Sequence, residues 1–255
     1  MSGKLSLEEE NALRFYIGDV SGNDTFFSDP KAYVVLNSLF FPDISTETAR
    51  ASEGKYLNPA IIADIPRLIG FFSNLFSAFA KSVIEEKILT YRVERLSDYQ
   101  LIRRNSATVS MTSTSTAGFL NAYRDRRGIA LMKFSLENTP YCIDISKALP
   151  YYAKSDEAEI LIAPFMKLNI EEIELNADEL KITDCDNTPP QISCLVKPIG
   201  VTHYSGNIPE LSADGSQAGQ RIYTALNNGT QPEKSDIELY SQWKIDLQKI
   251  LHNMI

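Results

Sequence analysis

Three short segments carry side chains that can do chemistry together, in the order arginine, hydroxyls, carboxylates. Residues 89–92 end in Arg92, residues 113–115 read Ser-Thr-Ser, and residues 157–159 read Glu-Ala-Glu. A guanidinium can bind phosphate oxygens bidentately, and hydroxyls can fix a ligand or a neighbouring side chain by hydrogen bonds. Paired carboxylates suit displacement at a sugar carbon, because one can favour a cationic transition state while the other orients the nucleophile. These segments predict an enzyme whose cleft holds a phosphorylated nucleotide.

The two carboxylates lie two residues apart in a strand-like segment. We therefore expect Glu157 and Glu159 on one face, roughly 7 Å apart along the strand. Ala158, Ile160 and Ile162 should point the other way, into a core. Taken alone, the pattern is common on solvent-facing strands, so a solvated strand is the alternative.

The arginine and the hydroxyls each have a structural alternative as well. Arg92 could form a surface ion pair on an edge strand instead of clamping phosphate. Ser113 and Ser115 should share one face of their strand, with Thr114 on the other. Residues 106–116 are rich in Ser and Thr, a context in which such a triplet arises easily.

Composition and charge narrow the function classes. The chain has 255 residues, enough for one large domain, and its 33 acidic against 25 basic residues give a net charge of −8. This balance argues against nucleic acid as a partner. Three cysteines without paired spacing and two histidines predict neither a disulfide framework nor a metal site.

The targeting signals point to a reducing environment. Residues 1–10 lack the basic and apolar regions of a secretory signal peptide. The phenylalanine-rich stretch 71–80 is too short and interrupted to span a bilayer, so we expect no membrane span. Core packing explains that stretch better than membrane binding.

The segments that must position these groups begin with helices. Ser6 and Glu9 form a capping box, so a first helix should begin near Leu7. Asp29 should cap a second helix, and further helices should follow Pro59 and Pro66. Within these, one apolar face has helical spacing and comprises Leu68, Phe72, Leu75, Phe79 and Val83.

Strand patterns take over after the helices. We predict strands over 88–93, 107–113, 128–136, 158–163 and 167–175, with weaker candidates at 179–182 and 191–196. Residues 201–232 read as a long loop, and a capping box of Ser235 and Glu238 should begin a final helix. The fold class is therefore α+β. We expect one compact domain with a helical region (1–87), a β-rich catalytic core (88–199) and a C-terminal extension (200–255).

Taken together, the three segments after a helical opening resemble the arginine-serine-glutamate class of mono-ADP-ribosyltransferases, especially the bacterial toxin and effector type. The resemblance extends from about residue 5 to residue 175. It implies N-terminal helices packed on a core of two small, mostly antiparallel β-sheets that form an NAD cleft. NAD would be a substrate, and no metal would be required.

The same resemblance implies residue roles. Arg92 would hold the NAD phosphates, and Ser113 would support the nicotinamide-ribose pocket. Glu159 would stabilise the oxocarbenium as nicotinamide leaves, while Glu157 would engage the incoming nucleophile. The implied cofactor-binding set is Tyr91, Arg92, Ser113, Thr114, Ser115, Tyr123, Arg126 and Glu159.

The loop before the glutamates would meet the target protein. Residues 145–156 match the family's target-recognition loop, and Tyr151 and Tyr152 would contact the acceptor together with Glu157. These tyrosines could equally close the local core.

The function implied is transfer of ADP-ribose from NAD to a protein side chain, most readily arginine, because Glu at position 157 resembles the arginine-modifying members. The partner would be a protein of a host cell and the enzyme a monomer. It would be an effector or toxin, secreted without a signal peptide and acting in the host cytosol, or else a cytoplasmic enzyme. The alternatives are an NAD glycohydrolase on the same scaffold and a non-catalytic protein-binding module.

Overall fold

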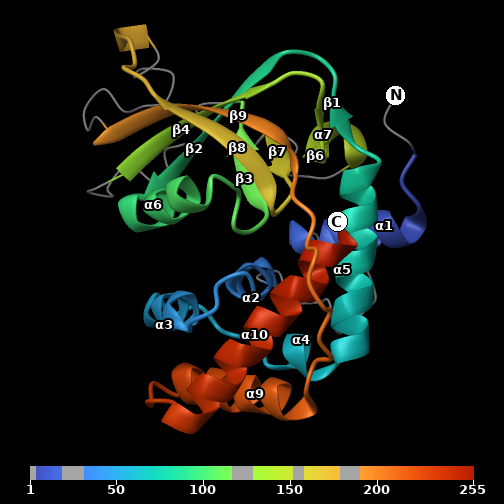
Figure 1. Ribbon diagram of the computed structural model, residues 1–255, viewed down its shortest axis with the longest axis vertical. Coiled ribbons are helices and arrows are strands. Elements are labelled where there is room, and N and C mark those ends of the chain that lie inside the picture. Colours follow the sequence, from blue (N-terminus) through green and yellow to red (C-terminus); the bar gives the residue numbers. More distant parts are fainter. Residues whose placement is uncertain (1–3, 19–31, 117–128, 152–157, 179–189) are drawn as a thin grey trace. The chain divides into compact units, whose positions relative to one another are not determined.

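The computed structural model describes residues 4–18, 32–116, 129–151, 158–178 and 190–255, which belong to two units (Figure 1). We call residues 6–78 and 203–255 the helical unit, and residues 79–202 with the segment before Ser6 the sheet unit. The chain therefore builds the helical unit first, then the sheet unit, and returns to the helical unit at its C-terminal end.

The helical unit begins as its sequence predicts. Ser6 Oγ accepts a hydrogen bond from Glu9 N at 3.3 Å, and Ser6 N donates to Glu9 Oε2 at 2.7 Å. This capping box confirms that the first helix begins at Leu7. The helices are α1 (Leu7–Tyr16), α2 (Ala32–Ser38), α3 (Ser45–Ser52), α4 (Ala60–Ala63), α5 (Ile65–Ala80), α9 (Ala213–Asn227) and α10 (Lys234–Met254).

Helix α5 buries most of the face predicted for it. Its fully buried members are Leu68, Phe72, Leu75 and Phe79. The helix ends at Ala80, however, and Val83 begins a strand instead of continuing the helical face. Of the helices in the described residues, none has the length and apolar character that crossing a bilayer requires.

The predicted loop over 201–232 is wrong, because it contains the fifteen-residue helix α9. Its glycines lie where α10 packs. A Cβ added at Gly215 would come within 2.5 Å of Trp243 Cβ, and one at Gly219 within 2.5 Å of Tyr240 Cε2. These glycines therefore allow close helix packing, although in the sequence they read as loop residues.

The start of α10 also differs from the prediction. The capping box of Ser235 and Glu238 does not form the boundary, since the helix begins at Lys234. The N-cap is Glu233, whose side chain makes no capping hydrogen bond. The N-cap predicted at Asp29 lies outside the described residues.

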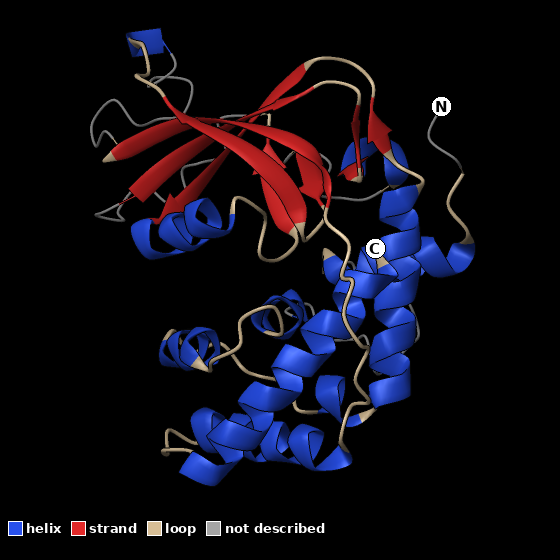
Figure 2. Ribbon diagram, in the orientation of Figure 1, coloured by secondary structure: helices blue, strands red, loops and turns tan. Residues whose placement is uncertain are grey.

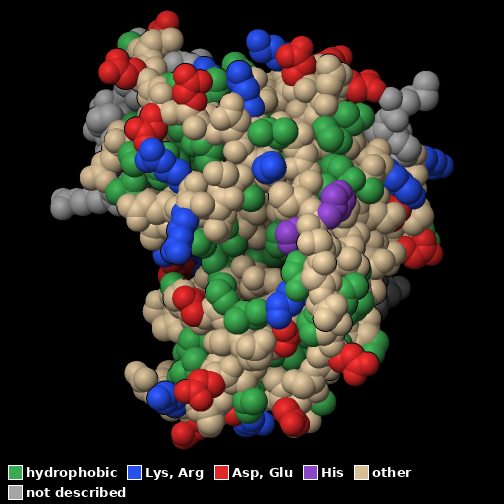
Figure 3. Space-filling view, viewed as in Figure 1, with side chains coloured by type: hydrophobic (Ala, Val, Ile, Leu, Met, Phe, Trp, Pro, Cys, Tyr) green, Lys and Arg blue, Asp and Glu red, His purple; other side chains and the backbone are tan. Residues whose placement is uncertain are grey.

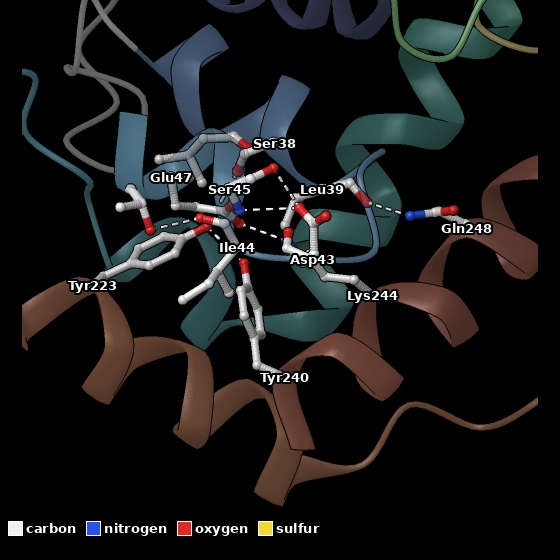
Figure 4. Close-up of polar contacts among 12 residues, drawn as sticks. Ser38, Leu39, Asp43, Ile44, Ser45, Glu47, Tyr223, Tyr240, Lys244 and Gln248 are labelled. Atoms are coloured by element: carbon white, nitrogen blue, oxygen red, sulfur yellow. Dashed lines mark hydrogen bonds and ion pairs between the residues drawn. The ribbon is translucent and has the colours of Figure 1, made fainter. Parts of the chain in front are cut away.

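A polar network lies in the core of the helical unit (Figure 4). Lys244 on α10 donates to Glu47 Oε1 on α3 at 2.8 Å and also to the backbone carbonyl of Asp43. The hydroxyls of Tyr223 and Tyr240 lie 2.6 Å apart beside this pair. The network joins the C-terminal helices to the N-terminal helices of the same unit.

The sheet unit contains a seven-stranded and a two-stranded sheet (Figure 2). The large sheet has the order β6-β7-β3-β2-β4-β9-β8, and β1 pairs with β5 in the small one. The strands are β1 (Val83–Ile84), β2 (Ile88–Arg95), β3 (Thr112–Ser115), β4 (Ile129–Leu136), β5 (Thr139–Pro140), β6 (Cys142–Asp144), β7 (Glu159–Ile162), β8 (Met166–Glu172) and β9 (Ile192–Val201). The helices of this unit are α6 (Leu96–Asn105) and α7 (Ile145–Ala148).

The large sheet is almost divided at one point. Strands β2 and β3 are joined only by the pair Tyr91 and Ser115, whereas β2 and β4 pair along their whole length. The part β6-β7-β3 therefore meets the part β2-β4-β9-β8 at a narrow junction. All pairs are antiparallel except β4 with β9. The predicted α+β class, with mostly antiparallel strands after N-terminal helices, is confirmed.

Several boundaries differ from the predictions. The strand predicted over 107–113 lies at Thr112–Ser115, and Ala107 makes an isolated bridge to Lys167. The strand predicted to reach residue 175 ends at Glu172, and the one predicted over 191–196 extends to Val201. The candidate strand 179–182 lies outside the described residues.

Helix α6 was not predicted, although it covers the core of the sheet unit. It contributes Tyr99 and Ile102 to a cluster that includes Met132 and Phe134 from β4 and Ile160 from β7. Both parts of the large sheet thus share one core.

Candidate functional site

The register of four neighbouring strands places four polar or aromatic residues in one row. Tyr91 on β2 pairs with Lys133 on β4 and with Ser115 on β3, and Ser115 pairs with Glu159 on β7. Directly opposed residues in antiparallel strands project from the same face. Three strand spacings separate the ends of the row, which puts the Lys133 and Glu159 backbones about 14 Å apart.

The Ser-Thr-Ser strand presents its two serines to this same face. Ser113 and Ser115 are half-buried, whereas Thr112 and Thr114 are buried. Thr114 Oγ1 donates to the carbonyl of Ile160 at 3.0 Å and so links β3 to β7 on the core side. The predicted alternation is confirmed, and it places Thr114 on the face opposite to Ser113 and Ser115.

Glu159 is the first residue of β7, one residue later than the predicted strand start. Ala158 has a positive φ of 43°, in the left-handed region, and its carbonyl accepts a hydrogen bond from Thr116 N at 3.3 Å. Regular alternation therefore begins only at Glu159, and the expectation of a continuous strand through both glutamates is wrong. Ile160 and Ile162 are buried in the core as predicted.

Arg92 lies at the junction between the two parts of the sheet. It follows Tyr91 in β2 and so leaves the strand from the opposite face, beside its pairing partner Met132. Its Nη1 donates to the backbone carbonyl of Ser113 at 2.7 Å, and its Nε donates to Glu94. The guanidinium therefore reaches across to β3 where the β2–β3 ladder has ended.

Two charged residues near this site were missed in the sequence. Lys133 is in the row described above, and Glu94 is paired with Arg92. Glu94 could have been noticed, because a residue two positions after Arg92 shares its strand face. Lys133 could not, because its place depends on the register between β2 and β4.

The structure leaves part of the predicted site undescribed. Glu157, Tyr123, Arg126 and Tyr152 all lie outside the described residues. Tyr151 is described and is 92% exposed, shortly after α7. Of the two interpretations of Tyr151, closure of a local core is therefore excluded.

The charge distribution and possible metal ligands were also compared with the predictions. On the face shown in Figure 3, described Lys and Arg side chains are interspersed with Asp and Glu. Within the described part of the chain, no group of three or more His, Cys, Asp or Glu side chains could hold a metal ion. Burial raises the pKa of the Cys142 thiol to about 12, so this cysteine is a packed core residue.

Comparisons with known proteins gave structural likenesses only, since neither protein-family models nor curated protein sequences matched. The enzymatic component C2-I of the C2 toxin from Clostridium botulinum has 16% identity and a TM-score of 0.47, over 78% of this chain and 44% of its own. The C3 exoenzyme of Clostridium limosum has 15% identity and a TM-score of 0.46, over 77% of this chain and 87% of its own. C3stau2 from S. aureus, solved with NAD, has 12% identity and a TM-score of 0.38, over 78% of this chain and 99% of its own.

The chain thus spans less than half the length of C2-I and most of the length of the two C3 proteins. At these identities and TM-scores, no residue role passes from them to this chain. The resemblance stated from the sequence nevertheless has its counterpart among solved structures: this chain is similar to bacterial mono-ADP-ribosyltransferases of the C2-toxin and C3-exoenzyme kind.

Proposed function

We propose that this protein transfers ADP-ribose from NAD to a side chain of another protein and releases nicotinamide. The observation that carries the proposal is the pairing of β3 with β7, which sets the Glu159 carboxylate directly opposite Ser115, with Ser113 on the same face. A carboxylate flanked by hydroxyls suits a reaction in which positive charge develops on a ribose.

Each group has a role in the proposed reaction. Glu159 accepts a hydrogen bond from the ribose and stabilises the oxocarbenium while the bond from the ribose carbon to nicotinamide breaks. Ser113 and Ser115 fix the ribose end of the substrate and the carboxylate. Lys133, at the other end of the row, supplies a cation for the diphosphate, and Arg92 supplies a second from the junction.

The proposed acceptor is an arginine. A protonated guanidinium is a poor nucleophile, so the enzyme must hold it close to the cationic ribose and help to remove its proton. Glu157 has that role in the proposal, and Tyr151 contacts the protein that carries the acceptor. Positioning of this kind can lower a barrier by about 7 to 11 kcal/mol in favourable systems.

The site of action is part of the same proposal. The acidic balance and the lack of cysteine pairs fit an effector that works in the reducing cytosol of a host cell. A host-cell lysate is therefore the source in which to seek the modified protein.

The test is incubation of the protein with labelled NAD and a host-cell lysate, followed by mapping of the modified residue by mass spectrometry. Glu159→Gln keeps the size of the side chain and removes its charge, so we expect loss of both nicotinamide release and protein labelling. Glu171→Gln, an exposed glutamate on β8, is the matched control and should leave both unchanged. Wild-type activity in Glu159→Gln would overturn the proposal.

Two further outcomes distinguish the alternatives. Nicotinamide release without label on any protein would identify an NAD glycohydrolase, with water as the acceptor. Absence of NAD binding in calorimetry would identify a non-catalytic binding module. Glu157→Ala should reduce transfer more than hydrolysis, because hydrolysis needs no guanidinium acceptor.

A further inference from the structure

The contact between Arg92 and Glu94 differs from an ordinary surface ion pair. The two residues are on the same face of β2, where their partners on β4 are the fully buried Met132 and Ala130. The side chain of Glu94 is 12% exposed and that of Arg92 is 27% exposed. Apolar neighbours and low exposure strengthen the attraction between the charges and limit screening by salt.

The guanidinium is held at two of its nitrogens by groups of fixed position. Glu94 accepts from Nε, and the carbonyl of Ser113 accepts from Nη1 at 2.7 Å. An arginine side chain has several rotatable bonds, so ordering it only when a ligand arrives would weaken binding. Two acceptors at adjacent positions of the planar group set both its location and its orientation.

The location matters because it lies where the sheet is weakest. Beyond the single pair of Tyr91 and Ser115, β2 and β3 have no further ladder pairs among the described residues. The Arg92 side chain spans this opening and satisfies the Ser113 carbonyl. The strand fixed in this way is the one that carries the Ser113 and Ser115 hydroxyls.

We propose that Glu94 is a positioning residue, which holds the Arg92 guanidinium against the Ser113 carbonyl and so fixes β2 relative to the serine-bearing strand. Glu94 acts through Arg92 and touches no substrate. This inference rests on the proposed function for its effect on NAD binding, whereas the contact itself can be measured without NAD.

The opposite role for Glu94 makes a different prediction. If its carboxylate merely neutralised Arg92 and repelled the NAD phosphates, removing it would tighten NAD binding. If it positions Arg92, Glu94→Ala should weaken NAD binding by about tenfold, because a hydrogen bond to a charged group is lost. Glu94→Gln keeps an acceptor oxygen at the same place and should stay within about threefold of wild type.

The experiment is a double-mutant cycle measured by calorimetry with NAD. The proteins are wild type, Glu94→Ala, Arg92→Ala and the double variant, with Glu172→Ala as a control that removes an exposed glutamate from its pair with Arg103 in the same unit. Glu94→Ala should have no further effect once Arg92 is absent, and the control should bind as wild type does. Additive effects, or tighter binding by Glu94→Ala, would overturn the inference.

A second readout needs no nucleotide. The Arg92 Nε–H resonance, assigned by its loss in Arg92→Ala, should exchange slowly with water in wild type and faster in Glu94→Ala. Equal exchange in the two proteins would overturn the positioning role even if NAD binds. A wild-type protein that binds no NAD would overturn the proposed function, and the exchange measurement would still decide whether Glu94 holds Arg92.

Discussion

Lys244 Nζ lies 2.8 Å from Glu47 Oε1, and both side chains are fully buried inside the helical unit (Figure 4). Burial raises the pKa of the Glu47 carboxyl, and the Lys244 charge opposes that change. Burial likewise lowers the pKa of the Lys244 amine, with Glu47 acting against it. Glu47 Oε2 has no hydrogen-bond partner among the described residues, so Lys244 is the main compensation for this charge.

Removing one member of this pair should therefore cost more than removing both. Lys244→Met or Glu47→Gln alone should lower the free energy of unfolding by about 3 to 5 kcal/mol, because an uncompensated buried group remains. The double variant Lys244→Met with Glu47→Leu should recover most of that loss. Urea unfolding followed by the fluorescence of Trp243, the single tryptophan, reports on this unit.

The control for this experiment is a more exposed pair on the same helix. Arg50 and Glu53 lie 3.4 Å apart with side chains 33% and 32% exposed. Glu53→Gln should cost about 1 kcal/mol or less. Equal losses from Glu53→Gln and Glu47→Gln would show that burial does not govern the contribution of the pair.

The hydroxyls of β3 should separate into a functional and a structural set. Ser113→Ala and Ser115→Ala should lower nicotinamide release with little change in stability, since both side chains are half-buried on the Glu159 face. Thr114→Val should cost about 1 kcal/mol of stability, because its buried hydroxyl donates to Ile160. Unfolding and nicotinamide release, measured on each variant, check this; a large loss of release in Thr114→Val with wild-type stability would contradict it.

Stability of the helical unit should depend on pH through Asp236. Hydrogen bonds from Arg221 Nε at 2.9 Å and Nη2 at 2.6 Å lower the pKa of this carboxyl below its ordinary 3.8. A carboxyl with a lowered folded-state pKa stabilises the fold above the ordinary value, and the contribution is lost as pH falls through the folded-state pKa. Wild type should therefore exceed Asp236→Asn in stability at pH 7, and this difference should shrink below pH 3.8. A difference that stays constant with pH would exclude this carboxyl as its source.

Tyr151 should affect the protein acceptor and not the nucleotide. Because it is 92% exposed, Tyr151→Ser should change stability by no more than about 0.5 kcal/mol. NAD hydrolysis should remain, while labelling of target protein should fall. Tyr56→Ser, at a tyrosine 58% exposed in the helical unit, is the matched control and should change neither activity. Unaltered labelling by Tyr151→Ser would remove this residue from target recognition.

Local interactions account for what could be predicted from the sequence. The capping box of Ser6 and Glu9, the buried face of α5 and the alternation of Ser113, Thr114 and Ser115 all depend on residues within a few positions of one another. Such features have a fixed period or a fixed offset along the chain. The α+β class followed from them for the same reason.

Helices α6 and α9 could not be predicted in this way. Helix α6 has no side-chain cap at Arg95, so its start carries no sequence mark. Helix α9 contains Gly215 and Gly219, which weaken helix propensity but fit against Trp243 and Tyr240. In both cases packing against distant residues outweighs the local preference.

The sequence by itself determined which residues could do chemistry and that helices would precede strands. Only the tertiary structure decided that Lys133, Tyr91, Ser115 and Glu159 form one row, because register depends on hydrogen bonds between strands far apart in the chain. It also decided that Arg92 reaches the Ser113 carbonyl at the junction of the sheet. The physical reason is that side-chain neighbours across a sheet are fixed by non-local pairing, which no spacing within one strand encodes.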